Sequence, residues 1–161
     1  RIVIARFPTQ SAEVCYELLH WLSAEVAKRS MSFWLSSRHL ELLNDRGGYQ
    51  SLPQLDGCHL TSEFMQSGET LPSGLALSGS CHHWRDIQKA QATGVEFITL
   101  SPVKQTSSHL DVVPMGWKEF AALTRQTSVP VYAMGGMSIG DAAQARRYFA
   151  QGIAGISCFL T

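Results

Sequence analysis

Residues 129–138, VPVYAMGGMS, decide the fold, because an apolar run ends there in a Gly-Gly pair and a polar helix start. Residues 129–134 are apolar at nearly every position and indicate a β-strand. Gly135 and Gly136 allow positive φ angles and a close approach of the backbone to another group. We therefore expect a strand, a tight turn and a helix over residues 139–150.

The Gly-Gly turn is also the first candidate binding site. Ser138 and Asp141 have the spacing of a helix-capping pair. Unpaired N–H groups at such a turn favour an anion, and in (β/α)8 barrels the loops after the last two strands commonly form a phosphate site. Ile156 and Ser157, on the last expected strand, would supply the other half. The alternative is that the glycines only form a tight turn.

Outward from this turn, short β-like runs alternate with helical stretches along the chain. The expected strands are residues 2–6, 32–36, 57–60, 75–80, 97–100, 129–134 and 153–158. The expected helices are residues 11–29, 39–44, 84–92, 116–126 and 139–150, and residues 61–67 form a segment with only a weak pattern. Such alternation favours a parallel sheet, because parallel strands need a crossover helix. The last two strands are so apolar that we expect both of their faces to be covered.

This alternation suits either a doubly wound sheet or a (β/α)8 TIM barrel. A closed barrel usually needs ~200 residues or more, and this chain has 161. Because the chain opens directly on a strand, we expect an α/β TIM barrel with strands 2–8 present and the first strand and helix upstream. No linker-like stretch interrupts residues 1–161, so we expect one N-terminally incomplete barrel domain.

Composition limits the classes of partner. The 13 basic and 13 acidic side chains cancel, and 45% of the residues are hydrophobic. This balance gives no electrostatic reason to expect nucleic acid or an anionic membrane, and no apolar run has the length of a membrane span. The scattered cysteines indicate reduced thiols of a cytoplasmic protein: Cys15, Cys58, Cys81 and Cys158.

His82 is the main candidate for catalysis, because it follows an expected strand and a histidine can act as acid or base near neutral pH. The alternative is that His82 only caps the next helix or bonds the backbone. His83 should point elsewhere, since successive strand side chains alternate. The same alternation lets the Cys58–His59 and Cys81–His82 pairs offer at most one inward ligand each, so we expect no zinc site.

The polar loop at residues 101–114 is the third candidate. It carries donors suited to a phosphate or pyrophosphate, namely Lys104, Thr106, Ser107, Ser108 and His109. Loops of this length are usually either functional or disordered without a ligand.

Taken in order, these motifs resemble the thiamine-phosphate synthase/TenI family over nearly the whole chain. The matching runs are GCHL at 57–60, SGSCH at 78–82, LSPVKQTSS at 100–108, PMGW at 114–117, PVYAMGGM at 130–137 and GIAGIS at 152–157. The resemblance implies that residues 2–6 are the family's second strand. It also implies a set of site residues: Gly135, Gly136, Ile156, Ser157, Thr106 and Ser108 for phosphate, Ser80 and Arg6 for the substrate, and His82 as acid/base.

The departures from the family pattern concern charge and metal. The Gln and Lys of the second strand are gone from residues 4–8, and His109 replaces a lysine. The Asn-Asp of the synthases is Ser36–Ser37 here, and a second carboxylate position falls at Phe64, beside Glu63. Pyrophosphate departure needs Mg²⁺ or comparable charge, so a chain that lacks both carboxylates is a poor candidate for the full synthase reaction. We therefore expect no metal and no cofactor, with Mg²⁺ as the alternative.

The resemblance therefore implies a protein that binds a phosphorylated thiazole or thiamine-type ligand, with a metal-independent activity like that of thiazole tautomerases. The motifs also resemble the synthase-like domain fused behind Nudix hydrolases. One alternative is thus a non-catalytic phosphate-ligand or regulatory module of a Nudix fusion protein; another is a Mg²⁺-dependent synthase. Whether the chain is an enzyme, a homodimer or fused to an N-terminal domain stays open here.

Overall fold

The computed structural model describes residues 1–7, 10–44, 47–106, 111–156 and 159. The strands are β1 (Ile2–Ala5), β2 (Ser32–Ser36), β3 (Gly57–Leu60), β4 (Ala76–Cys81), β5 (Phe97–Leu100), β6 (Val131–Ala133) and β7 (Gly152–Ile153). The α-helices are α1 (Ala12–Lys28), α2 (Glu41–Asn44), α3 (Ser62–Ser67), α4 (Trp84–Thr93), α5 (Gly116–Thr124) and α6 (Ala142–Arg147). Short 3-10 helices are η1 (Ser37–His39), η2 (Tyr49–Ser51) and η3 (Ile139–Asp141).

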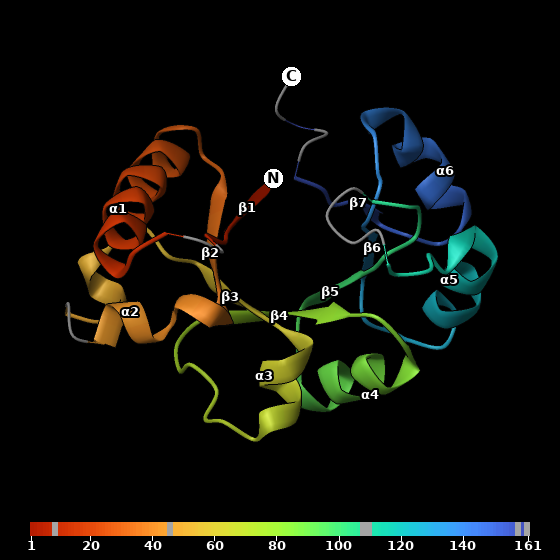
Figure 1. The fold of residues 1–161 in the computed structure, drawn as a ribbon, viewed down its shortest axis with the longest axis horizontal. Coiled ribbons are helices and arrows are strands. Elements are labelled where there is room, and N and C mark those ends of the chain that lie inside the picture. Colours follow the sequence, from red (N-terminus) through yellow and green to blue (C-terminus); the bar gives the residue numbers. More distant parts are fainter. Residues whose placement is uncertain (8–9, 45–46, 107–110, 157–158, 160–161) are drawn as a thin grey trace.

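The strands form one seven-stranded parallel sheet in chain order, from β1 at one edge to β7 at the other. Figure 1 shows the sheet curled, with the helices on its outer side. The expected alternation and parallel sheet are therefore confirmed. The described residues form a partly closed barrel, and the doubly wound alternative is wrong because the helices cover one face of the sheet.

The outer face of the sheet packs on the helices and forms the hydrophobic core. Side chains alternate along each strand, so every second residue points outward. One buried cluster joins such residues to α4 and α5: Cys58, Leu60, Ile98, Leu100, Val131, Ala133, Ile87 and Phe120. Burial raises the pKa of the free Cys58 and Cys81 thiols to about 12, which favours their protonated form.

Aromatic rings fill part of the inner face. The ring centroids of Trp34 and Phe97 lie 5.1 Å apart, and those of Phe97 and Tyr132 lie 5.5 Å apart. The indole of Trp34 extends over β3, since a Cβ on Gly57 would lie 2.5 Å from it. These rings therefore connect β2, β5 and β6 across the inside of the curl.

The C-terminal elements differ from the expectation. Instead of one helix over residues 139–150, the 3-10 helix η3 precedes α6, and Phe149 has a positive φ of 73° after the helix has ended. The last strand has only the two residues of β7, and Ile156 beyond it is 69% exposed. Both residues of β7 are only half-buried, so the full coverage expected for the last strand is not seen in the described residues. Within those residues β7 pairs with β6 alone.

Local capping signals mark the ends of two helices, whereas the expected helix at 39–44 is split into η1 and α2, and η2 was not expected. Ser11 caps α1 by accepting the Val14 N–H at 3.4 Å. Gly94 ends α4 in the left-handed conformation. Across the described ranges, none of the helices is both long and apolar enough to cross a membrane.

Candidate functional site

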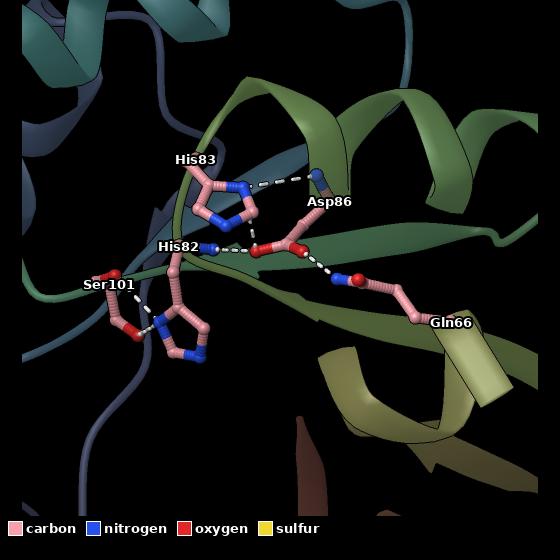
Figure 2. A network of polar contacts seen from close by, with 5 residues as sticks. All are labelled: Gln66, His82, His83, Asp86 and Ser101. Atoms are coloured by element: carbon pink, nitrogen blue, oxygen red, sulfur yellow. Dashed lines mark hydrogen bonds and ion pairs between the residues drawn. The ribbon is translucent and has the colours of Figure 1, made fainter.

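His82 lies just past the carboxyl end of β4, and the backbone of the next strand's end holds its ring (Figure 2). Its Nδ1 lies 2.9 Å from the carbonyl oxygen of Ser101 and 3.3 Å from the Ser101 hydroxyl. A carbonyl only accepts, so Nδ1 carries the proton of the neutral ring and Nε2 is left as the acceptor. Nε2 has no hydrogen-bond partner among the described residues, and the side chain is exposed. The backbone hydrogen bond that we considered as an alternative role of His82 is therefore present, and it leaves Nε2 able to accept a proton.

Asp86, on the first turn of α4, fixes the backbone around His82. It is 1% exposed, and its Oδ2 accepts the His82 N–H at 2.8 Å. Its Oδ1 accepts the Gln66 side-chain amide at 2.8 Å. The adjacent His83 turns the other way, as strand alternation predicts, and its Nδ1 accepts the Asp86 N–H at 3.4 Å as the helix cap. The capping role proposed as an alternative for His82 thus belongs to His83 (Figure 2).

The Gly-Gly turn follows β6 and packs closely on the loop after β5. Gly135 and Gly136 have φ angles of 92° and 63°. A Cβ on Gly135 would lie 2.7 Å from Pro102 Cα, and a Cβ on Gly136 would overlap the Gln105 carbonyl oxygen. Backbone hydrogen bonds join the two segments, from Val103 N–H to Met134 O at 2.9 Å and from Lys104 N–H to Gly135 O at 3.1 Å.

This packing requires both glycines even without a ligand, which is the simpler of the two interpretations of the motif. The N–H groups of Gly135 and Gly136 nevertheless meet no acceptor in the part of the chain that the structure describes. Consecutive backbone N–H groups of this kind can hold an anion. Packing alone therefore accounts for the two glycines, and anion binding by the two unpaired N–H groups stays a prediction.

Asp141 brings a carboxylate to the same turn. Its Oδ2 accepts both the Ser138 N–H and the Ser138 hydroxyl at 2.8 Å, which confirms the expected capping box. The Lys104 Nζ lies 3.1 Å and 3.0 Å from its two oxygens. The Ser138 N–H, then Lys104 and the Ser138 hydroxyl, lower the pKa of Asp141, so it stays ionised. A fixed negative charge paired with one ammonium thus lies beside the Gly-Gly turn.

A polar layer occupies the inner face of the sheet. His59 Nδ1 lies 2.8 Å from the Ser78 hydroxyl on the neighbouring strand. Burial, with a smaller contribution from the charge of Arg6, lowers the pKa of His59 to about 4. Thr99 is 2% exposed, and its hydroxyl has no partner among the described residues. Ser80, a predicted substrate contact, lies opposite Thr99 in the β4–β5 register.

Basic groups lie at the ends of β1 and β2. Arg6 follows β1 and is exposed. The buried His39 accepts the Phe7 N–H at its Nε2 at 2.9 Å. Burial, followed by the charges of Arg6 and Arg38, lowers the pKa of His39. The ring is therefore held neutral in the folded chain.

The positions where the resemblance places the Mg²⁺ ligands of the synthases carry a serine hydroxyl and, beside Phe64, one carboxylate, and both groups already have protein partners. The Ser37 hydroxyl accepts the Thr61 N–H at 3.0 Å. The exposed Glu63 carboxylate pairs with Arg38 at 3.1 Å. Over the described ranges, no group of three or more His, Cys, Asp or Glu side chains converges in a way that could hold a metal ion.

The predicted site residues fall into two groups. One group lies in the neighbouring strands β4 to β7 or in the loops that follow them, namely Ser80, His82, Thr106, Gly135, Gly136 and Ile156. Arg6 lies at the other edge of the sheet, after β1. Ser108 and Ser157 lie outside the described residues, as do Ser107 and His109.

Sequence reasoning missed His59, Ser78 and Thr99 as site residues. The signal was present, because each is a polar residue at an inward position of a strand whose outward positions are mostly apolar.

Comparison with known proteins assigns a family. A family model described as "Thiamine monophosphate synthase" matches residues 2–159. A putative thiamine-phosphate synthase 2 of Aquifex aeolicus is 30% identical over 138 residues, which cover 84% of this chain and 74% of the relative. A putative thiamine-phosphate synthase of Geobacter sulfurreducens is 35% identical over 123 residues, which cover 74% of this chain and 58% of the relative.

A solved structure agrees on the fold. The thiamine phosphate pyrophosphorylase of Pyrococcus furiosus superimposes with a TM-score of 0.73 over 96% of this chain and 71% of that one, at 16% identity. At this identity the likeness shows the fold alone. The family assignment rests on the sequence matches, and by them this chain belongs to the thiamine monophosphate synthase (TMP-TENI) family.

Proposed function

We propose that the chain binds a phosphorylated thiazole or thiamine-type ligand at the carboxyl ends of β4 to β7, and that His82 moves a proton on the bound ring as in thiazole tautomerases. The observation that carries the proposal is the hydrogen bond from His82 Nδ1 to the Ser101 carbonyl, which leaves Nε2 as a proton acceptor.

The phosphate would be bound chiefly by backbone groups. The unpaired N–H groups of Gly135 and Gly136 and the segment at Ile156 follow adjacent strands, β6 and β7. Thr106 belongs to the loop that packs on the Gly-Gly turn. Ser108 and Ser157 complete the proposed phosphate set, and Ser80 and Arg6 would contact the rest of the ligand.

The proposed reaction is an isomerisation in which one histidine returns the proton that it takes. Nε2 of His82 accepts a proton from one ring atom of the ligand, and the His82 side chain becomes an imidazolium. Nδ1–H keeps its bond to the Ser101 carbonyl throughout. The imidazolium then donates the Nε2 proton to a second ring atom, so that no cofactor, metal or co-reactant takes part.

His82→Ala tests the catalytic part, with His83→Ala as its matched control. Both variants remove one exposed imidazole from adjacent positions. We expect His82→Ala to lower the turnover of the phosphorylated thiazole by about 100-fold or more. His83→Ala loses the helix cap and the 3.3 Å contact of its Nδ1 with Asp86 Oδ2, while the His82 N–H keeps its own bond to Asp86. It should keep turnover within about threefold while unfolding more easily by about 1 kcal/mol. Equal activity of His82→Ala and the unaltered chain would remove His82 from the mechanism.

Calorimetry with thiazole phosphate and thiamine phosphate tests the binding part. Binding without turnover would favour the non-catalytic or regulatory module. A folded chain that binds neither ligand would contradict both the tautomerase-like activity and the non-catalytic module.

The names of the relatives favour a second candidate, a thiamine-phosphate synthase. It would require Mg²⁺-dependent formation of thiamine phosphate, for which the residues around Ser37 and Glu63 supply a poor set of ligands. Absence of product with Mg²⁺ and both substrates, in a chain that binds thiamine phosphate, would exclude it.

For the fold, we propose one barrel domain completed by an eighth strand that pairs with β1 and β7. Within the described residues these strands end the sheet. The fused Nudix-type domain and the homodimer stay predictions.

A further inference from the structure

The Gly-Gly turn presents an electrostatic conflict to the phosphate that we propose for it. Asp141 is 9% exposed, and its Oδ2 is fixed by the backbone N–H and hydroxyl of Ser138, two residues past the turn. Its lowered pKa keeps it ionised. An ionised carboxylate repels a phosphate dianion at close range. A phosphate at this turn therefore needs a compensating cation.

Lys104 has the position for this compensation. Its backbone N–H bonds the Gly135 carbonyl at 3.1 Å, so it starts from the loop that packs on the turn. Its Cβ lies 2.9 Å from where a Cβ on Gly136 would be, so its stem passes directly beside that glycine. Its Nζ then contacts both oxygens of Asp141, at 3.1 Å and 3.0 Å.

The pair also joins two loops that lie 37 residues apart in sequence. One loop carries Thr106, and the other carries Gly135 and Gly136, which belong to the same proposed phosphate site. The Lys104 side chain is 43% exposed, so the ammonium stays accessible from solvent.

We propose that Lys104 is a positioning residue that cancels the charge of Asp141 and holds the loop after β5 on the Gly-Gly turn, so that a phosphate dianion can bind there. This inference rests on the proposed function and adds the charge requirement of its binding site. It makes the Lys104–Asp141 pair a determinant of selectivity for phosphorylated over unphosphorylated ligands.

Four variants test the proposal by calorimetry with thiazole phosphate and with the corresponding unphosphorylated thiazole alcohol. Lys104→Met leaves Asp141 uncompensated and should weaken binding of thiazole phosphate about tenfold, with little change for the alcohol. Lys104→Arg keeps the charge and should bind within about threefold of the unaltered chain. Asp141→Asn should bind at least as tightly as the unaltered chain. The double variant Lys104→Met/Asp141→Asn has neither charge and should recover to within about threefold.

Lys89→Met is the matched control, because it removes an exposed lysine from α4, outside the contacts of the turn. It should bind both ligands as the unaltered chain does. In turnover, Lys104→Met should raise KM about tenfold and leave kcat within about twofold, since the residue touches no reacting atom. If Lys104→Met distorted the site, kcat would fall in addition to the rise in KM. Thermal unfolding of each variant shows whether it is folded.

The outcomes separate this inference from the proposed function. If the unaltered chain binds thiazole phosphate and Lys104→Met binds it equally well, only the role of Lys104 is wrong. If the double variant stays as weak as Lys104→Met, charge cancellation is wrong. If Lys104→Met does not fold, the double variant and Lys104→Arg test the role of Lys104 instead. The inference requires both of them to bind thiazole phosphate within about threefold of the unaltered chain. If the folded, unaltered chain binds no phosphorylated ligand, the proposed function and this inference both fall.

Discussion

Thr99 carries an unsatisfied polar atom inside the curl. It is 2% exposed, and its hydroxyl has no partner among the described residues. Such a group has lost its bonds to water without replacement, at a cost of ~1–3 kcal/mol. Thr99→Val keeps the branched shape and removes the oxygen. We therefore expect the free energy of unfolding to rise by about 1 kcal/mol in urea denaturation.

Thr124 provides the matched control for this substitution. It is also buried, at 7% exposure, but its hydroxyl donates to the Phe120 carbonyl at 2.8 Å. Thr124→Val removes a hydrogen bond that is made, so the free energy of unfolding should fall by about 1 kcal/mol. Equal destabilisation by both substitutions would show that the Thr99 hydroxyl is bonded in solution.

At the scale of elements, Gly57 on β3 sets the packing of the inner face. A Cβ at this position would lie 2.5 Å from the Trp34 ring, so the indole would have to move. Trp34 contacts Phe97, which in turn contacts Tyr132, so the displacement would pass across several strands. We expect Gly57→Ala to lower the free energy of unfolding by about 2–3 kcal/mol.

A smaller ring should relieve this overlap. Trp34→Phe combined with Gly57→Ala should be more stable than the sum of the two single changes predicts, by about 1 kcal/mol in a double-mutant cycle. Gly140→Ala is the control, because its added Cβ would meet its nearest atom at 3.7 Å. If Gly57→Ala behaves like Gly140→Ala, the indole does not occupy the space over β3.

The elements were predictable to different degrees for physical reasons. β2, β3 and β5 have the bounds expected from the sequence, because each buries apolar side chains that mark its position in the chain. The helix after the Gly-Gly turn was expected to be longer than α6. Its capping box closes a first turn of 3-10 type, and a positive φ at Phe149 follows its end, neither of which helical periodicity encodes.

The polar contacts of the site were less predictable than the elements. The sequence identified His82, Lys104 and Asp141 singly, but not the bonds of His82 to Ser101 or of Lys104 to Asp141. These bonds join loops that are 19 and 37 residues apart. Such contacts depend on how far the sheet curls, which no local pattern specifies.

At the scale of the whole molecule, the curl places histidines in the interior near basic residues. Burial, and to a smaller extent Arg6, lowers the pKa of His59 to about 4. Burial, with Arg6 and Arg38, also lowers the pKa of His39. Unfolding exposes both rings to water, where a histidine has its ordinary pKa of about 6.5. The folded chain therefore resists protonation that the unfolded chain accepts.

This difference predicts loss of stability in mild acid. Between about pH 6.5 and about pH 4 the unfolded chain binds protons that folded His59 does not, so protons favour unfolding. The contribution is complete above pH ~6.5 and falls as the pH drops through that window. His59→Gln keeps a polar side chain beside Ser78 but cannot titrate. From about pH 7.5 to about pH 4, the unaltered chain should lose about 2–3 kcal/mol more free energy of unfolding than His59→Gln.

Urea denaturation at a series of pH values measures both proteins, and the comparison isolates His59 because the acidic side chains are the same in each. His20→Gln is the matched control, since His20 is exposed on α1 and its loss leaves the interior unchanged. Its stability should follow the pH dependence of the unaltered chain. Should His59→Gln lose stability in parallel with the other two proteins, His59 would be protonated in the folded chain, and its ring would then have to be solvated at the mouth of the curl. The pH series therefore also measures how closed the interior of this partial barrel is in solution.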